Sequence, residues 1–309
     1  MKNYNFAENT LSILFLIIPI IFVIIGIVIF TFPLSQDIGI LLTIILFVSL
    51  ILLLLGFLLK KEGLNKKIRI IGWILFAFFW STQSNTLYFG EDGDIFNAAL
   101  AIAGVFALFY IAYHEWLSLK RKENISCINW VAGVAAVSGI IYFSIDQTPL
   151  AMWLREVVAA QSGGLLNIFT GNVTVQGINI HYELAHITLI FACTAVQSMV
   201  LFVGIILPLS NVTIKKKFFG LLITVVPIYV LNLVRNAGVT YLTGKNGPEF
   251  FSTAHNLIGK TGSLIALIVL VFIIIKIIPE VFNEIMCLTD LYKRNGPLEQ
   301  SIKKIWRKN

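Results

Sequence analysis

Long apolar runs without charged side chains constrain this chain more than any other feature of its sequence. Each run is about 20 residues long, which as a helix crosses a hydrocarbon core of roughly 30 Å. Of the 309 residues, 58% are hydrophobic and 13% are charged, whereas soluble domains hold about 25% charged residues. We therefore expect an all-α polytopic membrane protein. Eight spans are expected, at residues 11–32, 38–59, 68–89, 95–117, 128–145, 185–209, 218–241 and 261–278.

The basic residues predict the orientation of these spans. If eight helices alternate from a cytoplasmic N-terminus, nineteen of the 23 Lys and Arg residues fall on the cytoplasmic side, as the positive-inside rule requires. Both termini are then cytoplasmic, in the cell (plasma or inner) membrane. The net charge of +7 thus marks topology, and no nucleic-acid partner is expected. The exceptions, on the outer side, are Arg155, Arg235, Lys245 and Lys260.

One long connection separates the fifth and sixth spans. We expect a single integral membrane domain over 1–309, with an extracytoplasmic insert at 146–184, site-bearing helices at 185–279 and a basic cytoplasmic tail at 280–309. The insert begins with a helical pattern that lies in the interface with Trp153 at headgroup depth, or else packs as a short helix. Alternating residues around Gln176 and Gly177 then predict a small hairpin. Asn172 lies in a weak glycosylation sequon within the insert.

The three cysteines lie far apart, at 127, 193 and 287, and form no CxxC pair. Neither a disulfide framework nor a thiolate zinc site is expected, and Cys127 and Cys287 are interpreted as small apolar residues. Cys193 lies in the predicted sixth helix. There His186, seven residues earlier, and Gln197, four residues later, would share its face.

Arg235 lies near the outer end of the predicted seventh helix, beside Asn236 and three residues after Asn232. It either snorkels to the membrane edge or belongs to a buried polar pocket. His255 begins the last helix, which Ser252 or Thr253 would cap; alone, such a histidine is usually structural.

Topology relates these residues, because Cys193, Arg235 and His255 all fall at a similar shallow depth on the outer side. Acyl transfer requires a thiol with a base and a fixed cation nearby. The histidine accepts the proton, and the guanidinium lowers the thiol pKa and stabilises a tetrahedral oxyanion. Lateral proximity of the three is an expectation from their consecutive order.

At these residues the chain resembles the exosortase/archaeosortase family, multipass enzymes with an invariant Cys, Arg and His on successive late helices. The spacings from Cys193 to Arg235 and from Arg235 to His255 are 42 and 20 residues. Members of the family often carry Gly where this chain has Ala195. The matching pieces, within about 185–270, are Ala192-Cys193-Thr194, Asn232-Leu233-Val234-Arg235-Asn236 and Ala254-His255-Asn256-Leu257-Ile258-Gly259. Asn232 and Asn256 resemble the archaeosortase type.

The resemblance implies a cysteine protease or transpeptidase. Its partners would be secreted surface proteins that end in a short motif, a transmembrane helix and a basic tail. Such enzymes cleave near the motif and are thought to pass the new C-terminus to a membrane lipid. The catalytic residues would be Cys193, Arg235 and His255. The supporting residues would be Asn232, Asn236, Thr194, His186, Gln197 and Asn256.

Two other classes compete with this interpretation. In a transporter or channel for a small anion, Arg235, His255 and Glu183 would line the path. Two observations argue against a transporter: polar residues are absent at mid-membrane depth in the first, second and last spans, and no internal repeat is visible. The second is a structural or assembly factor without chemistry. No cofactor is expected. His181 and His186 do not form HExxH, so no metal is expected either.

Overall fold

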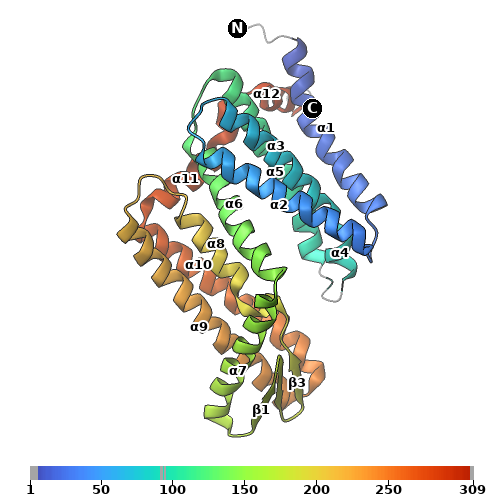
Figure 1. The fold of residues 1–309 in the computed structure, drawn as a ribbon, viewed down its shortest axis with the longest axis vertical. Coiled ribbons are helices and arrows are strands. Elements are labelled where there is room, and N and C mark those ends of the chain that lie inside the picture. Colours follow the sequence, from blue (N-terminus) through green and yellow to red (C-terminus); the bar gives the residue numbers. More distant parts are fainter. Residues whose placement is uncertain (1–5, 91–92, 94, 307–309) are drawn as a thin grey trace. The chain divides into compact units, whose positions relative to one another are not determined.

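The computed structural model describes residues 6–90, 93 and 95–306 (Figure 1). Lys2, Arg307 and Lys308, which are among the nineteen basic residues expected on the cytoplasmic side, lie outside these residues, as do Glu91, Asp92 and Asp94 between the third and fourth expected spans. The chain divides into two compact units. Unit 1 comprises residues 1–136 and 284–309, and unit 2 comprises 137–283.

Unit 1 is helical. Its helix α3 packs against α1, α2 and α5. Its elements are α1 (Phe6–Ile29), α2 (Gln36–Leu58), α3 (Leu64–Thr82), α4 (Ser84–Phe89), α5 (Ile95–Arg121), the first half of α6 (Ser126–Asp146), the end of α11 (Pro279–Thr289), η4 (Asp290–Arg294) and α12 (Pro297–Trp306).

Buried polar groups join the helices of unit 1. Arg69 of α3 forms a two-pronged ion pair with Glu115 of α5, and its Nη1 also donates to the Asn129 side chain at 2.7 Å. Arg69 and Glu115 are each at most 2% exposed. Because buried charges are stable only when paired and hydrogen-bonded, this contact fixes α3 against α5.

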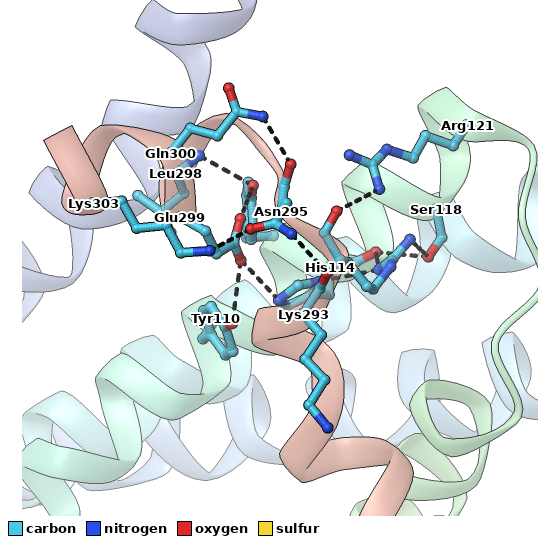
Figure 2. A network of polar contacts seen from close by, with 12 residues as sticks. Tyr110, His114, Ser118, Arg121, Lys293, Asn295, Leu298, Glu299, Gln300 and Lys303 are labelled. Carbon is cyan, nitrogen blue, oxygen red and sulfur yellow. Dashed lines mark hydrogen bonds and ion pairs between the residues drawn. The ribbon is translucent and has the colours of Figure 1, made fainter.

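The segment 280–309 contains helices, although only a basic tail was expected there. Figure 2 shows how its end docks on α5: the buried Glu299 carboxylate accepts hydrogen bonds from Tyr113 and Tyr110 at 2.9 and 3.2 Å and lies 3.3 Å from His114 Nε2. Burial raises the pKa of Glu299, but the hydrogen bonds from His114, its own backbone and Tyr113 together outweigh this, so its pKa lies below the usual range.

A disulfide joins Cys127 at the start of α6 to Cys287 of α11, across 160 residues. The interpretation of these residues as small apolar side chains was therefore wrong. Sequence separation carries no information on which distant helices meet, and the spacing test for cysteines covers only local pairs. Glu284 lies close to both sulfurs and accepts a hydrogen bond from Ser126 at 3.1 Å.

Unit 2 combines helices with a small sheet. It begins with the second half of α6. Its further elements are α7 (Pro149–Thr170), β1 (Val173–Gln176), β2 (Asn179–Tyr182), β3 (Ala185–Thr188), η1 (Phe191–Thr194), α8 (Val196–Ile206), α9 (Ile214–Asn246), η2 (Pro248–Phe250), η3 (Thr253–Gly259), α10 (Lys260–Ile277) and the start of α11.

The three strands form an antiparallel sheet in the order β1-β2-β3. The expected hairpin is confirmed in β1 and β2, where Gly177 supplies the positive φ of the turn. The sheet packs on α7 and α9 through glycines. A Cβ on Gly163 would lie 2.3 Å from Val175, and one on Gly244 would lie 2.7 Å from the Tyr182 carbonyl oxygen. These close approaches fix the sheet against both helices.

The expected sixth span, 185–209, is wrong in its first half. Residues 185–188 form β3, residues 191–194 form a 3₁₀ turn, and the helix α8 begins only at Val196 and has 11 residues. A short apolar run does not distinguish a strand from a helix by periodicity. Here Ala195, with φ at 63°, breaks any helical continuation.

Among the described residues, five helical segments are long and apolar enough to cross a membrane: α2, α5, α6, α9 and the run from η2 through α10. The chain is a multi-pass membrane protein. The count of eight spans and the orientation of the termini stay predictions, as does the division into 146–184, 185–279 and 280–309.

Candidate active site

Cys193 lies on a sharp turn between the sheet and α8. It is partly buried in the 3₁₀ turn η1 and packs against the apolar cluster of Ala159, Ile180 and Leu189. Two residues after Cys193, Ala195 adopts the left-handed conformation with φ 63° and ψ 2°. Glycine adopts this conformation without the steric penalty of a Cβ. The left-handed backbone at Ala195 therefore explains why a glycine suits position 195.

Thr194, a predicted supporting residue, stabilises this turn. Its hydroxyl donates to the Phe191 carbonyl oxygen at 2.7 Å, and the side chain is buried. The contact lies within the 3₁₀ turn, so Thr194 holds the backbone around Cys193.

Two amides of α9 hold the backbone of Cys193. The side-chain nitrogens of Asn232 and Asn236 both donate to the Cys193 carbonyl oxygen, at 2.8 and 3.0 Å. Both amides are buried, each at 8% exposure. Lying four residues apart on one helix face, they fix the Cys193 turn against α9 at the level of Arg235.

Arg235 lies between these amides in sequence and lines two cavities. The smaller, of about 90 Å³, is also lined by Ala192 and Ala195, the residues on either side of the Cys193–Thr194 pair. The Nε of Arg235 is buried and has no hydrogen-bond partner among the residues that the structure describes. A buried, unsatisfied donor of a charged group is expensive, and an anionic acceptor from a substrate would satisfy it.

His255 lies in η3, a π-helical segment that precedes α10 and packs against α9. Its ring stacks on Phe251 with centroids 5.2 Å apart and an interplanar angle of 20°. Short π-helical insertions are frequent at functional sites. Close to His255, a Cβ on Gly259 would lie 3.0 Å from Arg235 Nε, so this glycine lets η3 approach the guanidinium.

Three of the predicted supporting residues lie elsewhere. His186 belongs to β3 and faces His181 across the sheet, with their Nδ1 atoms 2.6 Å apart. Gln197 is exposed in the first turn of α8, and Asn256 is exposed with its amide 3.4 Å from the Ser252 hydroxyl. The expectation that His186, Cys193 and Gln197 share one helix face was wrong, because the chain is a strand, a turn and a new helix there.

Potential metal ligands do not gather at this site. Within the described part of the chain, the one group of three such ligands is Cys127, Glu284 and Cys287, which belongs to unit 1 and includes the disulfide. The pair of His181 and His186 is not part of any such group.

The sequence analysis missed two kinds of contact. Arg155 of α7 donates from Nε to the Leu189 carbonyl oxygen at 2.7 Å and so supports the segment that joins β3 to the turn of Cys193. Ser198 and Ser263 line the smaller cavity beside Arg235. The sequence does place Ser263 four residues after Gly259, on the same helix face. This spacing points to the cavity only once α9 and α10 are known to be adjacent.

The transport alternative placed Glu183 on an anion path. Instead, Glu183 pairs with Lys245 at 2.6 Å, and both side chains are more than 40% exposed. This surface ion pair gives the transport interpretation no support.

The chain is a multi-pass membrane protein, and two amides that flank an arginine hold the turn that carries its cysteine. The model of the transmembrane exosortase family matches residues 42–273, and the chain belongs to this family. It is also 23% identical, over 265 residues, to Archaeosortase A of Haloferax volcanii, covering 73% of this chain and 85% of that protein. No solved structure matches the chain.

Proposed function

We propose that this chain is a membrane-embedded cysteine transpeptidase. It cleaves the C-terminal sorting signal of secreted surface proteins, which consists of a motif, a transmembrane helix and a basic tail. It then transfers the new C-terminus to a membrane lipid. The main observation in support is that Asn232 and Asn236, which flank Arg235 in the sequence, both donate hydrogen bonds to the Cys193 carbonyl oxygen. Family membership and the similarity to Archaeosortase A support the same function.

The reaction has two steps. First, the Cys193 thiol loses its proton to His255, and the sulfur attacks the scissile carbonyl carbon while Arg235 stabilises the oxyanion. His255 returns the proton to the departing amine, which leaves a thioester on Cys193 and releases the C-terminal fragment. Second, a lipid nucleophile attacks the thioester carbonyl, His255 takes its proton, and the thiol is regenerated.

Arg235 suits the oxyanion role because its Nε is buried in a largely apolar cavity without a protein acceptor. In such surroundings a donor stabilises developing negative charge more strongly than in water. The site would face the extracytoplasmic side, where the scissile bond of a secreted substrate emerges.

The test is Cys193→Ala in the host cell, with intact masses of the surface proteins as readout. We expect precursors that retain their C-terminal helix, and normal maturation would refute the mechanism. Asn246→Ala is the matched control, because this exposed amide of α9 donates to the Leu242 carbonyl oxygen and is not among the described residues that line either cavity.

A further inference from the structure

The larger cavity lies between α9 and the η3–α10 segment and has no role in the two chemical steps. It measures about 310 Å³ and shares Leu231, Arg235, Ser263 and Ala266 with the smaller cavity beside the Cys193 turn. The two cavities are therefore neighbours, and Arg235 lines both. A pocket of this size is at the lower end of those that bind small ligands, so it fits a short peptide segment.

The lining is apolar and depends on glycines. Among the described residues that line the larger cavity, Arg235 is the single charged one. Gly238, Gly259 and Gly262 contribute no side chain to its walls. A glycine inside a helix lowers helix stability relative to alanine, so each calls for a reason.

Packing within the chain explains Gly259 but not the other two. A Cβ on Gly259 would lie 3.0 Å from Arg235 Nε, whereas a Cβ on Gly238 or Gly262 would meet nothing within 4 Å. Contacts with the described part of the chain therefore do not account for these two glycines. What they provide is open space on facing walls of the cavity, next to the buried and unsatisfied Nε of Arg235.

Resting on the proposed function, we infer that this cavity is the subsite for the short motif of the sorting signal. An uncharged, apolar side chain of the motif occupies the space between Gly238 and Gly262, while the adjacent scissile carbonyl lies at Arg235. A basic motif residue is excluded, because no acidic partner is present among the described lining residues and burying an unpaired charge is unfavourable. Gly238 and Gly262 determine specificity by their lack of side chains.

The test fills the cavity with a larger side chain in the enzyme and then compensates with a smaller side chain in the substrate motif. The probe is a precursor that accumulates uncleaved in Cys193→Ala cells, purified with each motif residue in turn replaced by Ala, Leu or Lys. Gly262→Leu and Gly238→Leu are expected to lower kcat/KM for the native precursor at least 10-fold, chiefly through KM. A precursor with Ala at the occupying motif position recovers most of this loss, while Lys there abolishes cleavage by the unsubstituted enzyme.

Two controls separate this effect from misfolding. Gly104→Leu in α5 and Gly39→Leu in α2 also place a side chain where a Cβ meets nothing within 4 Å, and we expect cleavage within twofold of the unsubstituted enzyme. Equal rates of Cys193 alkylation by iodoacetamide in all variants show that the site is folded. Gly262→Ala adds a single methyl group and should give an intermediate loss.

The inference is overturned if both leucine variants cleave the native precursor at the unsubstituted rate. It is also overturned if they form the thioester normally but fail to transfer it, since the cavity would then bind the lipid acceptor. Cleavage by Cys193→Ala would instead refute the proposed function, so the two failures are distinguishable.

Discussion

The two amides on the Cys193 carbonyl offer the sharpest test of how α9 builds the site. We consider Asn232→Ala, Asn236→Ala and the double variant. Each single change removes one buried hydrogen bond, at 2.8 or 3.0 Å, and should lower the free energy of unfolding by about 0.5–1.5 kcal/mol. In each case the other amide still donates to the carbonyl.

The double variant deprives the carbonyl of both donors. Leaving a buried acceptor poorly satisfied costs about 1–3 kcal/mol, so the double variant should lose more stability than the sum of the single variants, by about 0.5–1 kcal/mol. Since misplacing a reacting group by about 1 Å lowers rates by roughly 10²-fold, thioester formation should fall by that order in the double variant alone.

The assay is SDS-induced unfolding in mixed micelles, followed by tryptophan fluorescence, together with cleavage of a purified precursor. Asn246→Ala is the matched control: it lies on the same helix, is exposed, and donates locally to the Leu242 carbonyl oxygen. Its stability should change by less than about 0.5 kcal/mol. If the double variant matches this control in stability and rate, the amides do not position Cys193 and the reasoning fails.

Three further results are expected. Ala195→Gly should raise the free energy of unfolding by about 0.5–1 kcal/mol, because relief of the left-handed penalty, about 1–2 kcal/mol, exceeds the entropy that glycine adds to the unfolded chain; a loss of stability would contradict the assigned φ. Since the pKa of Glu299 is lowered in the folded protein, its ionised form stabilises the docked α12, and this stability is present above the ordinary Glu pKa and lost as pH falls through the lowered value. The hydrogen-exchange protection factors of α12, which correct for the intrinsic pH dependence of exchange, should therefore fall on acidification, and Glu299→Gln should have lower protection at neutral pH and lose this dependence; equal protection in both proteins would contradict the docking. Denatured, unreduced protein should take up one iodoacetamide, at Cys193, and three after reduction; three without reduction would disprove the Cys127–Cys287 bond.

Patterns that depend on local composition were readable in advance. Charge-free runs of membrane-spanning length predicted the long helices, and the alternation around Gly177 predicted the hairpin. The two asparagines flanking Arg235 predicted a polar pocket, and both amides are buried beside the Cys193 turn. In each case, neighbouring residues alone carry the signal.

Features that depend on distant contacts were not readable. Residues 185–188 are apolar enough for a helix, but pairing with β2 makes them a strand, and this moved His186 and Gln197 away from Cys193. The disulfide between Cys127 and Cys287 depends on helices 160 residues apart. The cavities beside Arg235 are lined by residues of both α9 and α10, so they follow from the packing of these two helices.

The central claim is that Cys193 forms a thioester with the cleaved substrate, and trapping that intermediate tests it most directly. The purified enzyme is mixed with a precursor in the absence of lipid acceptor, quenched in acid and analysed by intact mass and peptide mapping. The account predicts an adduct on Cys193 with the mass of the N-terminal product, which hydroxylamine removes and which Cys193→Ala lacks. Cleavage without any adduct on Cys193, at an undiminished rate in Cys193→Ala, would contradict it.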